Sequence, residues 1–417
     1  MKKKRYALMV AILCVVVMGS LGGLSFYNLL HNNKQHYESN LNNNDIGDES
    51  KNEEKEKTYD ELLDEKSDKV LSSMSLKEKI LSLFILECDN LHDNGETVTL
   101  YDESVKNKLN EYPVGGIILF ADNIVDRQQV INLNNEIQKN SRIPMFIGVD
   151  EEGGKVSRIA SNKKMGTTKF ESMKSIGDSG DMNKAYEVGE TIGREIYELG
   201  FNLDFAPDSD VLTNPDNVEI GTRSFGSEPN LVAGMAVNTV KGLQENNVCA
   251  VMKHFPGHGA SSANSHNQYT YTPQDLENMR KVEFLPFKKG IDFGVDFILV
   301  SHIAAPNVTG DKTPSTLSRK IVNDILRNEL NYDGVVITDA LNMKAVSSYY
   351  TEEKMYIKAL EAGCDMLLMP QNIDKAYESI LNAYNDGTIS EERIDKSVKR
   401  ILKAKLRRNI IKEGIFI

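Results

Sequence analysis

The sequence is poor in cysteine and in positive charge. It has four cysteines in 417 residues, and 49 lysines and arginines stand against 61 aspartates and glutamates, so the formal net charge is −12. Cys14 lies in the N-terminal apolar run, and the other three cysteines are isolated in apolar segments: Cys88, Cys249 and Cys364. Without metal, redox or disulfide spacing, these three are expected to be small core residues. The negative charge and the lack of a basic patch argue against a nucleic-acid partner.

Motifs of several common enzyme classes are also missing. No Gly-x-Gly-x-x-Gly turn follows the first strand-like run, which argues against a doubly wound dinucleotide-binding sheet. No His-x-His pair of the kind found in metal-dependent barrel hydrolases occurs on an early strand. His254 and His258 cannot share a metal-binding helix, because proline and glycine lie between them. We therefore predict no cofactor and no metal.

The N-terminus has the pattern of a membrane segment. Four basic residues at positions 2–5 precede 25 uncharged residues at positions 6–30. This run is long enough to span a bilayer, and its basic flank predicts a cytoplasmic N-terminus. Cleavage of a signal peptide near residues 20–22 is the alternative. We favour an uncleaved single-pass anchor (1–30), and in both cases the remainder lies outside the cytoplasm.

Composition divides the rest of the chain in two. Residues 31–57 are rich in Asn, Glu and Lys and have few aliphatic residues, so we expect a disordered linker. Residues 58–417 are long enough for one large domain, which we expect to be monomeric. Ser75 and Glu78 have the spacing of a capping box and predict the start of a helix.

Short apolar runs recur along the domain and alternate with segments of helical spacing. Helical apolar spacing is seen around Val130 and Ile137, and again from Ala185 to Ile196, where Gly200 predicts the helix end. A basic helix is expected at 391–408. The predicted strands are 83–86, 116–120, 145–149, 202–205, 248–252, 297–300, 334–337 and 366–369. Eight buried strands alternating with helices predict an α/β fold, a (β/α)8 TIM-type barrel, as a single catalytic domain behind the membrane segment.

Polar residues gather directly after five of these strands. The positions are Asp150 to Glu152, Asp208 and Asp210, Lys253 and His254, Ser301 and His302, and Asp339. Catalytic groups of such barrels lie at the C-terminal ends of the strands. Each residue alone could be structural, for example as a helix N-cap, but their convergence predicts a site.

The segment after the fifth predicted strand is the most informative. Residues 253–266 hold Lys253 and three histidines, His254, His258 and His266, and we expect a loop that begins at Lys253. A Schiff-base lysine is conceivable here, although the charged surroundings give no reason for a lowered pKa of Lys253. A carboxylate on one strand and a proton donor on a loop suit glycosyl transfer, because two groups must flank the scissile bond.

Four motifs between Ser75 and Leu402 resemble glycoside hydrolase family 3, in its β-N-acetylhexosaminidase branch. They are IGVDEEGG (147–154), IGTRSFG (220–226), KHFPGHG (253–259) and VITDALNMKA (336–345). The resemblance implies that Asp339 is the nucleophile and that His266 is the general acid/base. It further implies that the sugar is held by Asp150, Arg158, Arg223, Lys253 and His254.

Three positions depart from the family pattern. Asn264 stands where the family usually has the aspartate that orients the histidine, so we expect a slower or acid-shifted enzyme, by about tenfold or more. A pH profile that Asn264→Asp leaves unchanged would contradict this. Lys155 replaces a usual arginine, and Asp208 replaces a usual apolar residue.

The resemblance thus predicts a membrane-tethered, retaining exo-β-N-acetylglucosaminidase. It would release terminal N-acetyl-β-D-hexosamine from glycans or muropeptides during peptidoglycan turnover. Three alternatives stay open: a β-N-acetylglucosaminide phosphorylase, a β-glucosidase, and a catalytically impaired wall-glycan-binding protein.

Overall fold

The computed structural model describes residues 57–93, 95–261 and 270–412. The predicted membrane segment, the linker up to residue 56, and the site residues Asn264 and His266 lie outside the described residues. No helix among the described residues is both long and apolar enough to cross a bilayer. Residues Thr58–Ile417 form one compact unit.

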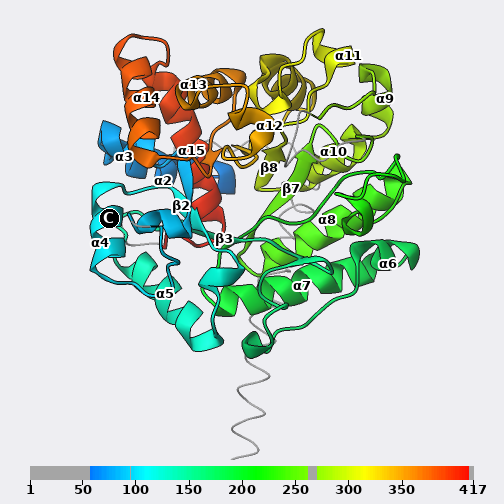
Figure 1. The fold of residues 1–417 in the computed structure, drawn as a ribbon, viewed down its shortest axis with the longest axis horizontal. Helices are drawn as coiled ribbons and strands as arrows, with labels where there is room; N and C mark the ends of the chain where they lie inside the picture. The colour runs from blue at the N-terminus through cyan, green and yellow to red at the C-terminus, as the bar shows by residue number, and fades with distance from the viewer. Residues whose placement is uncertain (1–56, 94, 262–269, 413–417) are drawn as a thin grey trace, which may run out of the picture. The chain divides into compact units, whose positions relative to one another are not determined.

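Eight parallel strands form one sheet at the centre of this unit (Figure 1). They are β1 (Phe84–Glu87), β2 (Gly116–Ile118), β3 (Phe146–Val149), β6 (Leu203–Asp204), β7 (Cys249–Phe255), β8 (Phe297–Val300), β9 (Val335–Thr338) and β10 (Leu367–Leu368). β1 pairs with both β2 and β10, so the order of strands runs from β10 through β1 to β9. A bridge between Ile337 in β9 and Met366, directly before β10, links these two outermost strands. The sheet is therefore a nearly closed barrel of the predicted TIM type.

Helices follow the strands in chain order around the outside of the barrel (Figure 1). Two helices precede the first strand: α2 (Tyr59–Ser72) and α3 (Leu76–Leu81). The others are α4 (Glu103–Glu111), α5 (Arg127–Lys139), α6 (Met173–Asp178), α7 (Met182–Glu198), α8 (Pro229–Glu245), α9 (Leu276–Lys281), α10 (Phe284–Phe293), α11 (Pro306–Thr309), the π-helical segment Lys320–Glu329, α12 (Lys344–Ser347), α13 (Glu352–Ala362), α14 (Ile373–Asn385) and α15 (Glu391–Arg407).

Local sequence explains where the helices begin and end. Ser75 accepts a hydrogen bond from the Glu78 amide and Glu78 bonds back to Ser75, which is the capping box predicted for α3. Thr58 caps α2 in the same way. Gly200, with φ +87°, follows the C-terminus of α7 as predicted, in a backbone conformation that glycine adopts without steric cost.

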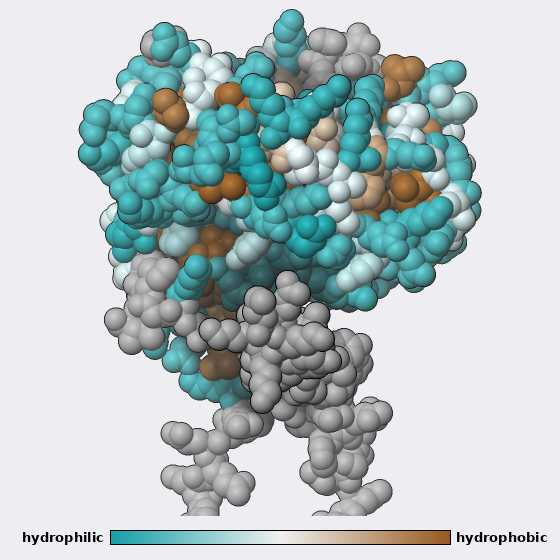
Figure 2. All heavy atoms as spheres, turned by 90° about the horizontal axis from the view of Figure 1, so that it is seen from below, coloured by the Kyte–Doolittle hydropathy of each residue, from teal (hydrophilic) through white to brown (hydrophobic). Residues whose placement is uncertain are grey.

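The core lies inside the barrel and between the barrel and the helices. The barrel strands consist almost wholly of buried residues, which is why they read as continuous apolar runs. Cys88, Cys249 and Cys364 are buried free thiols, so their prediction as core residues is confirmed. On the face shown in Figure 2, hydrophobic side chains form only small separate patches among hydrophilic ones.

Two features near the C-terminal ends of the strands differ from the sequence prediction. Lys253 and His254 lie within β7, not in a loop, because the Lys253 amide and carbonyl continue the hydrogen bonding to Pro207 and Ser209. A small antiparallel hairpin of β4 (Glu151–Gly153) and β5 (Val156–Ser157) also follows β3. Both segments contain charged residues and lack the run of apolar residues by which the other strands were predicted.

Candidate active site

A cavity of about 300 Å³ opens at the C-terminal ends of the barrel strands. Six of the predicted site residues line it together: Asp150, Arg158, Arg223, Lys253, His254 and Asp339. The remaining lining residues include Glu152, Glu219, Phe120, Phe205 and Met343. The position of this cavity is the one at which barrel enzymes carry their active sites.

Asp339 is held at the mouth of the barrel by backbone contacts. Its amide donates to the Val300 carbonyl at 2.9 Å, which continues the pairing of β9 with β8. Its carboxylate accepts a hydrogen bond from the Ala340 amide at 2.9 Å. The Ala340 carbonyl lies 2.9 Å from Nε2 of buried His302. Since a carbonyl can only accept, Nε2 of His302 carries the proton in this contact.

Glu152 connects the two basic residues of the site. Its carboxylate accepts two hydrogen bonds from Arg223, at 2.8 and 2.7 Å, and lies 2.6 Å from the Lys253 ammonium. Lys253 also donates to Asp150 at 2.8 Å. Burial raises the pKa of Glu152, but the charges of Arg223 and Lys253 outweigh it and the net pKa is lowered.

These ion pairs decide the state of Lys253. Burial lowers the pKa of Lys253, but the carboxylates of Asp150 and Glu152 raise it by a larger amount, so the net pKa lies above the usual lysine value. Lys253 is thus a cation that fixes two carboxylates, which argues against the Schiff-base alternative.

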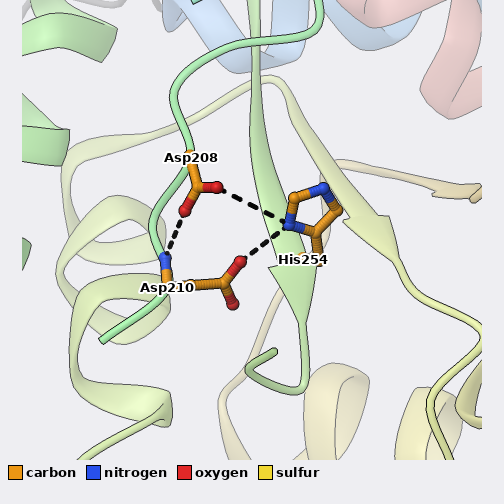
Figure 3. A group of neighbouring side chains, drawn as sticks. All are labelled: Asp208, Asp210 and His254. Carbon is orange, nitrogen blue, oxygen red and sulfur yellow. Dashed lines mark hydrogen bonds and ion pairs between the residues drawn. The ribbon is translucent and has the colours of Figure 1, made fainter. Parts of the chain in front are cut away.

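His254 links this network to two buried aspartates (Figure 3). Its Nδ1 lies 2.7 Å from Asp210 Oδ2 and 4.0 Å from Asp208 Oδ2, and its Nε2 lies 3.3 Å from Arg223. Burial lowers the pKa of His254, but Asp210 raises it more, so the net pKa is raised. Burial and the neighbouring Asp210 raise the pKa of Asp208 to about 7. Among the described residues, these three are the group whose donor atoms lie close enough to hold a metal ion.

The chain beyond β7 packs against the segment that follows β6. Nδ1 of His258 lies 2.8 Å from the Ser261 hydroxyl, and the His258 carbonyl accepts from Asn217 at 2.8 Å. A Cβ at Gly259 would lie only 1.9 Å from the Val211 carbonyl oxygen. Only glycine fits here, so backbone contact fixes residues 257–261 beside the site.

Glu152 was noted as a strand-end residue but was given no role in the predicted site, although a signal was present. Asp150 and Glu152 are two residues apart and, in extended chain, point the same way, whereas Glu151 points oppositely. Glu151 instead accepts hydrogen bonds from Ser157 and the Ile159 amide. Asp208 and Asp210 were noted as strand-end residues, but the sequence gave no sign of their contact with His254.

Known proteins are similar to this chain in both sequence and fold. The model of the glycosyl hydrolase family 3 N terminal domain matches residues 75–404. A beta-hexosaminidase A of Pseudoalteromonas piscicida is 31% identical over 369 residues, which are 81% of this chain and 61% of that protein. A beta-hexosaminidase of Nitrosomonas eutropha is 34% identical over 290 residues, 68% of this chain and 80% of that protein.

A solved structure is likewise similar to this chain in sequence and fold. The family 3 β-N-acetylglucosaminidase of Paenibacillus sp. str. FPU-7 is 37% identical with a TM-score of 0.76, over 81% of this chain and 63% of that chain. This chain thus spans about three fifths of the Paenibacillus and Pseudoalteromonas proteins. The family match covers nearly the whole compact unit and confirms the resemblance seen in the four motifs. The chain belongs to glycosyl hydrolase family 3.

Proposed function

We propose that this protein is a retaining exo-β-N-acetylglucosaminidase. The observation that carries the proposal is the meeting of Asp339 with Asp150, Arg158, Arg223, Lys253 and His254 around one cavity. A cavity of about 300 Å³ lies at the small end of the range for ligand pockets, as suits one terminal sugar. The names of the relatives, beta-hexosaminidase and β-N-acetylglucosaminidase, support the same substrate class.

The proposed reaction has two steps. The Asp339 carboxylate attacks the anomeric carbon while the bond to the leaving oxygen breaks and His266 donates a proton to that oxygen. His266 then takes a proton from water, whose oxygen attacks the anomeric carbon and releases the Asp339 carboxylate with retained configuration. The ion-paired residues around Lys253 hold the sugar hydroxyls and the N-acetyl group in place.

The natural substrate and location are part of the proposal. An uncharged run at 6–30 with a basic flank favours a membrane anchor that leaves the domain outside the cytoplasm. There, terminal N-acetylglucosamine on peptidoglycan fragments would be the accessible substrate, with the protein acting as a monomer.

The test uses the full chain and chromogenic sugars. Release of nitrophenol from the β-N-acetylglucosaminide is followed beside release from the β-glucoside, each with and without phosphate. We expect phosphate-independent release from the N-acetyl sugar, reduced by at least about 10³-fold in Asp339→Asn with binding of N-acetylglucosamine retained. Asp333→Asn is the matched control, because Asp333 is exposed at the opposite end of the same strand.

Other outcomes point to the alternatives. Release that requires phosphate would identify a phosphorylase, and preference for the glucoside would identify a β-glucosidase. A folded protein that binds the sugar but releases nothing would be a glycan-binding protein.

A further inference from the structure

We propose that Asp208, Asp210 and His254 form a binding site for one divalent first-row transition-metal ion, with Zn²⁺ as its chemical type. This site lies behind the sugar pocket, since His254 lines the pocket whereas Asp208 and Asp210 do not. Both aspartates are fully buried. The prediction of no metal rested on spacing along the chain, and this group forms only when β7 lies beside the segment after β6.

The donor atoms are close enough to share one ion (Figure 3). One oxygen of each carboxylate and Nδ1 of His254 lie within 4.8 Å of one another. Around a tetrahedral Zn²⁺, ligand atoms are about 3.3 Å apart, given bonds of about 2.0 Å. The observed 2.7 Å from His254 to Asp210 and 4.0 Å to Asp208 lie on either side of that value. Side-chain movements that change these two distances by about 0.6 to 0.7 Å, and that bring the two carboxylate oxygens to a similar spacing, would give the geometry.

Each aspartate is already oriented by its second oxygen. Asp208 Oδ1 accepts the Asp210 amide at 3.0 Å, and Asp210 Oδ1 accepts the His258 amide at 2.6 Å. This leaves Oδ2 of both residues directed at His254 Nδ1. Such outer hydrogen bonds are what orients metal ligands in proteins.

Asp208 supplies an independent indication of a missing partner. Its Oδ2 is fully buried and accepts no hydrogen bond in the described structure. The nearest cation is Nε of Arg223 at 3.5 Å, and Arg223 directs its hydrogen bonds to Glu152 instead. A buried carboxylate oxygen without a hydrogen bond is costly, and a coordinated cation removes that cost.

The ion-paired residues around Asp208 and His254 contain more carboxylates than cations, which favours the binding of a divalent cation. Two cations, Arg223 and Lys253, face four carboxylates. The carboxylates are those of Asp150, Glu152, Asp208 and Asp210. A metal ion on Nδ1 would displace the proton of His254, and with His254 neutral and the four carboxylates ionised an ion of charge +2 would balance the cluster. The positive charge of Arg223 is offset by its two bonds to Glu152. One imidazole nitrogen with two carboxylate oxygens suits Zn²⁺ better than Mg²⁺, which prefers oxygen ligands only.

The experiment measures metal binding directly on the full chain after dialysis against EDTA. Zn²⁺ affinity is determined by competition with a chromogenic chelator, and Co²⁺ is added separately to record its visible absorption spectrum. Asp208→Asn and Asp208→Val are compared with the wild type, the second because an apolar residue is usual at this position. Glu283→Gln is the matched control, because Glu283 is another buried carboxylate without a hydrogen-bond partner. Far-UV circular dichroism confirms that each variant is folded, and His254→Gln serves if neither Asp208 variant folds.

We expect one Zn²⁺ per chain and a low-symmetry Co²⁺ spectrum, with affinity at least about tenfold weaker in the Asp208 variants and unchanged in Glu283→Gln. The proposal is overturned if the wild type binds no Zn²⁺, if the Asp208 variants bind it as tightly, or if Glu283→Gln loses it equally. None of these readouts depends on glycosidase activity.

Discussion

At the scale of single residues, three successive acids after β3 have three different surroundings. Asp150 faces the cavity and pairs with Lys253, Glu151 is bonded within the β4–β5 hairpin, and Glu152 joins Lys253 to Arg223. The position after a predicted strand pointed to all three acids alike, and the resemblance alone gave Asp150 a role in binding. The role of Glu152 depends on ion pairs to Lys253 in β7 and to Arg223 in the short turn Gly221–Arg223, which no local pattern contains.

Glu152→Gln is therefore expected to destabilise the protein by about 3 kcal/mol, because it leaves two buried cations with one fewer carboxylate. Urea unfolding at pH 7 measures the change. Glu151→Gln is the matched control. It should lower the free energy of unfolding by less, because Glu151 is bound by uncharged hydrogen-bond donors and does not contact a cation among the described residues. Equal losses in the two variants would contradict the assignment.

A second residue-scale prediction concerns Lys405 in α15. Its ammonium nitrogen donates to the Gly115 carbonyl at 3.0 Å, and burial lowers its pKa to about 7. The unfolded pKa is about 10.4, so between these values the unfolded chain binds a proton that the folded chain does not. The penalty of this burial is thus complete below pH 7 and disappears as the pH rises towards 10.

Lys405→Met should remove the penalty, and the Gly115 carbonyl would keep its bond from the Phe146 amide. We expect a gain on the order of 4 kcal/mol at pH 6 that falls towards zero at pH 10, measured by urea unfolding. Lys396→Met, at an exposed position of the same helix, should show no such trend. A gain independent of pH would rule out the titration as its cause.

At the scale of secondary structure, the sequence was sufficient for the barrel strands and insufficient for the site's framework. All eight predicted strands exist, because strands buried on both faces produce continuous apolar runs. The extension of β7 through Lys253 and His254 was missed, since charged residues in a strand are buried only through partners such as Asp150 and Asp210. The predicted roles of Asn264 and His266 stay predictions.

The packing of α7 on α8 gives a test at this scale. A Cβ on Gly189 would lie 2.2 Å from the Thr239 carbonyl oxygen, so Gly189→Ala must push the two helices apart. We expect a loss of about 2 kcal/mol in thermal or urea unfolding. Gly234→Ala in α8 is the control, because its Cβ would meet only the flexible end of Met182. It should be neutral or stabilising by up to about 1 kcal/mol.

At the scale of the whole molecule, the barrel order brings together residues of β7 and residues directly after β3 and β9 that are nearly 200 positions apart in the chain. The unit that holds them begins at the Thr58 cap and has its own core. We expect a truncated chain that starts at Thr58 to fold with the melting temperature of the full chain and with the same rate in the nitrophenol assay of the proposed activity. A lower melting temperature after truncation would show that the preceding residues contribute to the fold.

The pairing of β1 with β10 has a consequence for protein synthesis. β1 leaves the ribosome early, yet one edge of it stays unpaired until Leu367 and Met369 arrive to donate to Leu83 and Ile85. Closure of the barrel must therefore follow translation of nearly the whole chain. A product that terminates before β10 would expose the edges of β1 and β9 together, and such open edges are where strands of separate chains pair and aggregate.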